Sequence, residues 1–260
     1  MDKYEISQRI EKFAPLDTQE SWDCSGWGVN VSANDEISKI MLCLTVTDDI
    51  VKQAKENGCD MIISHHPLFF APLDWKTINI YCAHTNLDIA HGGTTDCLIE
   101  RILKLSPTLL LPHGGGKNFD FCLQKSEIQE GANSHNTTFN RQTFLRYIQT
   151  EINVSEFINI LKQISPNLRY VNNNNIQTLK KIAFCAGSGA EFIPEAYSNG
   201  ADALVIGDLK FHTALESPII LFDIGHFESE IGVLKVFETL INNDVEVIYA
   251  QEKSPFNYQG

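Results

Sequence analysis

Short apolar runs alternate with amphipathic stretches along most of the chain. The apolar runs predict strands over 39–45, 61–64, 80–83, 219–223 and 245–250. The amphipathic stretches predict helices over 1–13, 48–57, 96–105, 154–164 and 228–242. Strands that alternate with helices are typical of βαβ units, so we predict an α/β fold of mixed sheets flanked by helices.

Two segments of the chain resemble each other at an offset of 142 positions. Residues 39–70 align without gaps with 181–212, and eight of the 32 positions are identical, against roughly two expected by chance. Strand, helix, Gly-x-Asp and second strand coincide in the two segments. We therefore predict two related β-α-β halves over 1–113 and 179–260, separated by a less regular insertion over 114–178.

The composition of the chain disfavours several classes of protein. Hydrophobic residues make up 43% of the chain, and 20 Lys+Arg against 33 Asp+Glu give a formal net charge of -13. This charge disfavours nucleic-acid binding, because a polyanion meets a repulsive average field. The apolar runs are too short to cross a membrane, the first residues lack the apolar region of a secretory signal, and the cysteines form no CxxC pair. We expect a cytoplasmic protein with reduced thiols.

Three polar clusters follow predicted strands, where open α/β sheets place ligands. They are Ser64-His65-His66-Pro67, His84-Thr85-Asn86-Leu87-Asp88 and Gly225-His226-Phe227-Glu228-Ser229-Glu230. Adjacent histidines can serve two ions, and His226 and Glu230 share one face if the helix has begun. Each cluster also has a structural interpretation: a surface histidine pair, an Asx-turn at Asp88, or a charge that complements a helix N-terminus at Glu230.

Two further features carry weaker signals. Gly187-Ser188-Gly189 lies between a predicted strand and a helix, where backbone N–H groups can bind phosphate, but an ordinary tight turn is the favoured interpretation. The predicted strand at 245–250 offers an edge through which subunits can associate.

The ordered motifs resemble those of the Nif three-like family, whose members are also labelled GTP cyclohydrolase I type 2 homologs and dinuclear-metal hexameric proteins. The matching motifs are S-H-H-P at 64–67, H-T-N-L-D at 84–88, G-S-G at 187–189, G-D-x-K-x-H at 207–212 and G-H-x-x-S-E at 225–230. The resemblance begins at Trp22-Asp23 and covers almost the whole chain. It implies a homohexamer, built as a trimer of dimers.

The resemblance also implies a ligand set for two divalent ions, which can be zinc, iron, manganese or nickel. The implied ligands are His65, His66, Asp88, His226 and Glu230. Asp88 or Glu230 would bridge the ions, and His84 would lie nearby, where it can transfer a proton. Asp208 and His212 belong to a family motif without an assigned role.

The chain departs from the family pattern at two positions. Cys24 stands where the family usually has Asn, and Thr45 stands where Asp is frequent. Neither departure is expected to touch a proposed ligand.

Two functions from different classes fit these residues. The leading hypothesis is a metal-dependent hydrolase that acts on a small, nucleotide-like substrate, because paired cations activate water and hold substrate oxygens. Two divalent ions beside two carboxylates would also leave the pocket positive within an acidic protein, so a small phosphorylated substrate can enter. The alternative is a non-catalytic metal-binding scaffold or metal-handling protein.

Overall fold

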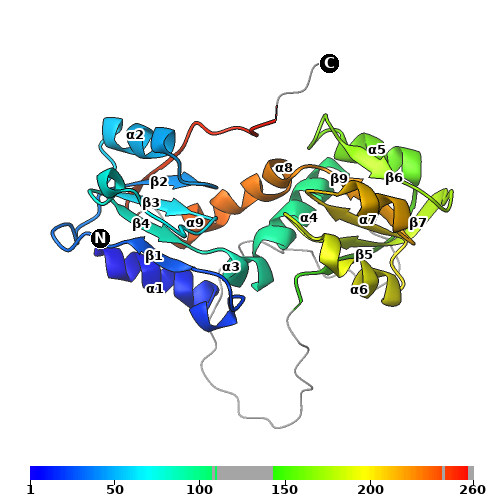
Figure 1. Ribbon diagram of the computed structural model, residues 1–260, viewed down its shortest axis with the longest axis horizontal. Helices are drawn as coiled ribbons and strands as arrows, with labels where there is room; N and C mark the ends of the chain where they lie inside the picture. The colour runs from blue at the N-terminus through cyan, green and yellow to red at the C-terminus, as the bar shows by residue number, and fades with distance from the viewer. Residues whose placement is uncertain (107–108, 110–142, 242–243, 257–260) are drawn as a thin grey trace, which may run out of the picture.

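The computed structural model describes residues 1–106, 109, 143–241 and 244–256. These residues form two five-stranded mixed sheets, each in its own lobe and each flanked by helices (Figure 1). The predicted α/β fold is confirmed. Among the described residues, no helix is both long enough and apolar enough to cross a membrane.

The first sheet has the strand order β1-β4-β3-β2-β10. Its strands are β1 (Gly26–Val29), β2 (Lys39–Cys43), β3 (Met61–Ser64), β4 (Asn79–Cys82) and β10 (Glu246–Tyr249). β10, β2, β3 and β4 run parallel, and β1 pairs antiparallel with β4. The predicted last strand therefore lies at a sheet edge, where it pairs with β2 from the opposite end of the chain.

Alternate residues of each strand in the first sheet pack on opposite faces. Ile40 and Leu42 of β2 lie in a core with helices α1 (Lys3–Phe13) and α9 (Leu234–Ile241). Met41 and Cys43 lie in a second core with helix α2 (Asp48–Glu56), which contributes Ile50, Val51 and Ala54. The period of two along the strand thus explains why helices cover both faces.

The second sheet has the strand order β5-β7-β8-β9-β6. Its strands are β5 (Arg146–Asn153), β6 (Arg169–Val171), β7 (Thr178–Phe184), β8 (Ala203–Ile206) and β9 (Ile220–Asp223). The three central strands are parallel, and the two edge strands are antiparallel to their neighbours. Helices α4 (Thr94–Leu105) and α5 (Val154–Leu161) pack on one face, and α6 (Ile193–Ser198) packs on the other. Helix α7 (Phe211–Glu216) lies between β8 and β9 in the chain.

The internal repeat is visible in the structure. β2-α2-β3 corresponds to β7, the 3₁₀ helix η4 (Ala190–Phe192) with α6, and β8, at the predicted offset. The Gly-x-Asp motif has the same function in both halves. Asp60 accepts two backbone N–H groups at the start of β2, and Asp202 does so at residues 180 and 181 of β7. Each carboxylate thus fixes the start of the neighbouring parallel strand.

The elements are not confined to the predicted domain ranges. β5, α5 and β6 fall within 114–178 but belong to the second sheet, while β10, near the end of 179–260, joins the first. The predicted Gly114–Gly116 boundary lies outside the described residues. The division into 1–113, 114–178 and 179–260 therefore stays a prediction.

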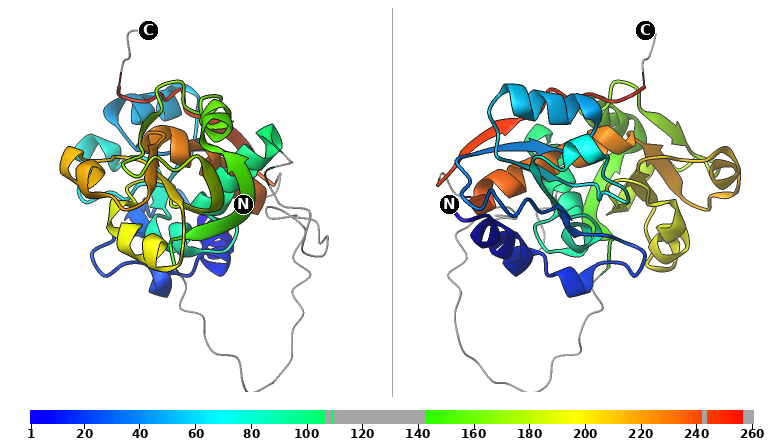
Figure 2. Two further views of the ribbon diagram at one scale, coloured as in Figure 1. Left: turned by 90° about the vertical axis from the view of Figure 1, so that its right-hand side faces the viewer. Right: turned by 60° about the vertical axis from the view of Figure 1, so that its left-hand side comes forward.

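Short helices lie between the two sheets (Figures 1 and 2). These are α3 (Thr85–Ile89), α4 and α8 (His226–Glu230), which continues through the 3₁₀ helix η5 (Ile231–Val233) into α9. The helix predicted at 228–242 is thus divided. Gly232 lies within η5, and glycine weakens a helix interior; it also leaves room for Arg101 of α4, whose Cδ would lie 2.9 Å from a Cβ atom at this position. Two further 3₁₀ helices, η1 (Leu16–Thr18) and η2 (Leu73–Trp75), lie in loops of the first lobe.

A buried ion pair joins the lobes near α3. Arg146 of β5 reaches Asp96 of α4 with an Nε–Oδ1 distance of 3.1 Å, and it donates to the carbonyl oxygens of Ile89 and Ala90. Asp96 is 2% exposed and also accepts the backbone N–H of Gly92. The second sheet thus fixes the segment between α3 and α4.

Candidate metal centre

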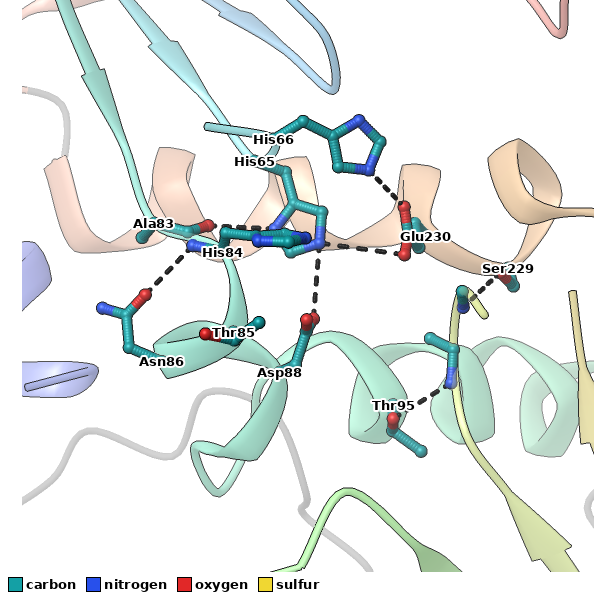
Figure 3. Close-up of polar contacts among 12 residues, drawn as sticks. His65, His66, Ala83, His84, Thr85, Asn86, Asp88, Thr95, Ser229 and Glu230 are labelled. Atoms are coloured by element: carbon teal, nitrogen blue, oxygen red, sulfur yellow. Dashed lines mark hydrogen bonds and ion pairs between the residues drawn. The ribbon is translucent and has the colours of Figure 1, made fainter. Parts of the chain in front are cut away.

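The five predicted ligands converge where the two lobes meet. His65 and His66 follow the end of β3, Asp88 lies on α3, and His226 and Glu230 lie on α8. Figure 3 shows His65 and His66 directed toward Glu230, and Asp88 directed toward His65. Oε1 of Glu230 lies 3.9 Å from Nε2 of His65. Oε2 lies 2.9 Å from Nε2 of His66 and 3.0 Å from Nε2 of His226. Glu230 is therefore the central carboxylate.

His65 and Asp88 present an unusual pair of buried atoms. The imidazole of His65 is fully buried, and its Nε2 lies 3.3 Å from Oδ1 of Asp88. Among the described residues, neither atom has a hydrogen-bond partner with normal geometry. Nδ1 of His65 lies 2.9 Å from the carbonyl oxygen of Ala83, which can only accept, so Nδ1 carries the proton. In neutral His65, lone pairs of Nε2 and Asp88 therefore face each other, an arrangement that requires a cation or a proton between them.

Each of the three predicted histidine ligands is oriented through its other ring nitrogen. The partners of the Nδ1 atoms are the carbonyl of Ala83 for His65 (2.9 Å), the hydroxyl of Thr45 for His66 (2.6 Å) and the carboxylate of Asp208 for His226 (2.6 Å). All three Nε2 atoms are thereby directed to the centre. Metal-binding histidines usually have this arrangement, because the outer partner fixes the ring and its tautomer.

The contact of Thr45 corrects the sequence analysis. The prediction that neither departure from the family pattern touches a proposed ligand is wrong for Thr45, because its hydroxyl holds His66. Asp208 orients His226 in the same way, through Nδ1. The backbone of Asp208 itself has a φ of 56°. His212 instead lies exposed on α7, where its ring packs against Phe211. Sequence spacing indicates none of these contacts, since they depend on the orientation of each imidazole.

The carboxylates and imidazoles shift one another's pKa. Burial favours the neutral form of Glu230, but hydrogen bonds from His226 and His66 outweigh it and hold the pKa of Glu230 well below its ordinary value. Burial likewise lowers the pKa of His65 and of His226, yet the nearby carboxylates raise both to about 9. For His66, burial dominates and lowers the pKa. The centre thus has a strong negative field that attracts protons or metal cations.

His84 lies beside the centre and is held by Asp23, a residue without a role in the sequence analysis. Nδ1 of His84 is 3.1 Å from Oδ1 of Asp23. Burial opposes ionisation of Asp23, but hydrogen bonds from His84 and Thr85 outweigh it and lower its pKa. The ionised carboxylate can only accept, so Nδ1 of His84 is the donor, and the tautomer of the neutral imidazole has its lone pair on Nε2. The only sequence signal for Asp23 is its place at the start of the family resemblance.

Ring nitrogens and carboxylate oxygens group into two clusters among the described residues. One comprises His65, His66 and His84, and the other comprises His66, His226 and Glu230, with ligand atoms within 4.8 Å of one another in each. The clusters share His66. Imidazole and carboxylate donors together suit zinc, iron, manganese or nickel better than calcium. The donor set therefore fits divalent transition-metal ions.

Close packing fixes the position of Glu230. Gly187 has a φ of 69°, and a Cβ atom there would lie 2.2 Å from Oε1 of Glu230. The N–H of Gly187 donates to the hydroxyl of Ser229, at 2.9 Å. This N–H is therefore already used within the fold, which supports the tight-turn interpretation of Gly187-Ser188-Gly189 over a phosphate site.

The internal repeat also extends into the centre. His84 and Asp88 lie 142 positions before His226 and Glu230, the same offset that relates the two β-α-β units. α3 and α8 thus present a His-x-x-x-carboxylate pair from corresponding places in the two halves. The offset was present in the sequence, and extending the alignment past residue 70 would have revealed this symmetry.

These features define a two-lobed α/β protein with a histidine-rich candidate metal centre between its lobes. The chain belongs to the Duf34/NIF3 (NGG1p interacting factor 3) family, whose model matches residues 1–255. A GTP cyclohydrolase 1 type 2 homolog from Clostridium perfringens is 33% identical, with 98% of each chain aligned. The GTP cyclohydrolase 1 type 2 of Helicobacter pylori is 28% identical, over 92% of this chain and 91% of that protein.

A solved structure shows the same fold. The Bacillus cereus protein related to NIF3 matches this structure with a TM-score of 0.74, covering 100% of this chain and 99% of that chain. The two sequences are 20% identical. The two-lobed arrangement is thus shared at low sequence identity.

Proposed function

We propose that this protein is a metal-dependent hydrolase that acts on a small, nucleotide-like substrate. In this proposal, two divalent ions would be held by His65, His66, Asp88, His226 and Glu230. The proposal draws on the similarity to the GTP cyclohydrolase 1 type 2 of Helicobacter pylori and the homolog from Clostridium perfringens, and on the donor set of the centre.

One observation carries the proposal: Nε2 of His65 and Oδ1 of Asp88 are buried, 3.3 Å apart and without normal hydrogen-bond partners. Leaving such atoms without a partner costs about 1–3 kcal/mol for each group. The Nδ1 contact of His65 excludes rotation to a better partner without loss of the bond to Ala83. A cation between the two atoms removes both penalties.

The residues around the centre have distinct tasks. When bound, divalent ions supply Lewis acidity, which lowers the pKa of water and polarises substrate oxygens. Thr45 and Asp208 keep the imidazoles of His66 and His226 directed inward. His84 accepts or returns a proton at Nε2, because Asp23 occupies its Nδ1. Asp23 is thus a positioning residue that sets the tautomer of His84.

Metal analysis combined with a hydrolysis screen tests this function. The metal content of the purified protein is measured by plasma mass spectrometry, and GTP, ATP and their monophosphates are incubated with the loaded protein and separated by chromatography. His65→Ala is compared with His212→Ala, a matched histidine change on the exposed helix α7. We expect His65→Ala to lose metal affinity and hydrolysis by at least about 100-fold, while His212→Ala retains both.

The outcomes separate the two functional classes. Hydrolysis that persists in His65→Ala would refute a hydrolase centred on this site. Stoichiometric metal without hydrolysis of any nucleotide would favour the metal-binding scaffold instead. Normal metal content in a His65→Ala/His226→Ala double variant would exclude the site itself.

A further inference from the structure

A cavity of about 470 Å³ adjoins the candidate metal centre. His66 and His226 form part of its wall, so a molecule inside it lies against two of the proposed metal ligands. Its size is within the range of pockets that enclose small organic ligands. The sequence analysis identified no substrate pocket, because the wall combines residues 44–50, 226–227 and 251–256.

The segment after β10 forms one side of this cavity. Residues 250–256 leave the edge of the first sheet and extend toward α8 (Figures 1 and 2). Ala250 donates its N–H to Leu42, and Gln251 exchanges hydrogen bonds of 2.9 and 3.2 Å with the side chain of Gln53. Oε1 of Glu252 accepts the N–H of Leu44, at 2.7 Å. These contacts fix the segment at the C-terminal end of β2, beside the metal centre.

The wall of the cavity is rich in rings. The imidazoles of His66 and His226 are joined by the phenyl rings of Phe227 and Phe256, and Ile50 adds an aliphatic surface. Phe256 is 63% exposed although it lines the cavity. Aromatic rings offer both faces and edges to another flat ring, and burial of apolar area adds to the attraction. The wall therefore fits an aromatic or heteroaromatic ring.

The wall of the cavity also contains charged side chains. The carboxylates of Asp49 and Glu252 already accept hydrogen bonds, from Gln53 and from the backbone of Leu44. Lys253 adds a positive charge at the same rim. Two carboxylates and one ammonium do not by themselves favour an anion, so the oxygen-bearing end of the ligand is assigned by the adjoining metal centre, because carbonyl and anionic oxygens bind divalent metal ions.

We propose that this cavity is the binding site for the ring of the substrate, with the segment 251–256 as its outer wall. The ligand has one flat aromatic or heteroaromatic ring in contact with Phe227 and Phe256, and an oxygen-bearing group directed at the metal centre. This inference rests on the proposed function, because it requires metal ions at that centre, and it adds which class of molecule enters.

Two hydroxamate probes separate the ring site from the metal centre. Acetohydroxamate and benzohydroxamate carry the same metal-binding group and differ in a methyl against a phenyl group. Their affinities for the zinc-loaded full-length protein are measured by calorimetry. We expect benzohydroxamate to bind about 10-fold more tightly or better, with a more negative heat-capacity change because its ring is buried.

Two phenylalanine variants locate the ring. Phe256→Ala should reduce the preference for benzohydroxamate to about 3-fold or less, because one wall of the cavity is lost. Phe211→Ala is the matched control, since Phe211 is 71% exposed on α7 and does not line the cavity. This control should retain the full preference. Both side chains are exposed, so neither change disturbs a buried core.

Each outcome has a defined meaning. Equal affinity of the two probes for the unaltered protein would overturn the ring site while leaving the metal centre intact. An undiminished preference in Phe256→Ala would overturn the assignment of the outer wall. Failure of both probes to bind the zinc-loaded protein would overturn the metal centre, and with it the proposed function.

Discussion

Replacement of Gly187 by alanine tests whether the position of Glu230 controls metal binding. The new Cβ atom would lie 2.2 Å from Oε1 of Glu230, more than 1 Å closer than the ordinary contact distance of about 3.5 Å. The carboxylate or the turn must therefore move. Because Glu230 faces three imidazoles at 2.9–3.9 Å, a shift of this size disturbs every one of these contacts.

A second glycine provides the control. Gly200 has a φ of 76°, close to the 69° of Gly187, but a Cβ atom there has nothing within 4 Å. Gly187→Ala and Gly200→Ala should each lose about 1–2 kcal/mol of unfolding free energy from the backbone conformation alone. Only Gly187→Ala also displaces Glu230, so we expect its metal affinity to fall by about 10- to 100-fold, the range typical for changes around a metal site.

The assay separates these effects. Urea unfolding of the metal-free proteins reports the backbone cost, and competition with a chromophoric chelator reports zinc affinity. Equal zinc affinity in the two variants would refute the idea that Glu230 is a ligand positioned by Gly187. A loss of affinity in Gly200→Ala as large as in Gly187→Ala would show instead that general destabilisation weakens the site.

Three other changes address separate parts of the molecule. Arg146→Ala should destabilise the protein by about 3–5 kcal/mol in urea unfolding, because it removes the guanidinium partner of the buried Asp96 carboxylate and leaves it the N–H of Gly92 and the more distant His91; unchanged stability would contradict this. Asp23→Asn should slow hydrolysis and alter its pH profile while zinc affinity stays within about 3-fold, because an amide nitrogen in place of Oδ1 cannot accept from Nδ1 of His84, while the amide oxygen can still accept from Thr85. Partial burial raises the pKa of Asp60, but hydrogen bonds from the start of β2 outweigh it and lower the pKa. The stability that this carboxylate contributes is present above its unfolded pKa of about 3.9 and is lost as pH falls through the lower folded value. The destabilisation caused by Asp60→Asn should therefore shrink as urea unfolding is repeated at decreasing pH.

The local pattern predicted much of the fold. Ile50, Val51 and Ala54 mark the buried face of α2, and the run at 61–64 coincides with β3, because both signals arise from neighbouring residues. Pairing between distant segments was not predictable in the same way. β10 lies beside β2 across some 200 residues, and the close packing of Arg101 on Gly232 brings together two separate helical segments.

The candidate site shows the same division. The motifs identified the residues that converge. β3 and β4 end at one edge of the first sheet, but α8 follows β9 of the second sheet, so its approach to them depends on how the two lobes pack. The residues that orient them were not identified, because nothing in the sequence indicates which hydroxyl or carboxylate faces Nδ1 of a given histidine. Thr45, Asp208 and Asp23 required the folded arrangement. The roles of the five predicted ligands stay a prediction until metal is measured.

The donors of the centre come from both lobes, and this has an energetic consequence. His65 and His66 belong to the first sheet, whereas α8, which carries Glu230, follows the last central strand of the second. A bound ion therefore acts as a cross-link, and its binding free energy opposes separation of the lobes. At 100 times its dissociation constant, an ion adds about 2.7 kcal/mol to that resistance. Hydrogen exchange along the α3–α8 junction should consequently slow on metal loading.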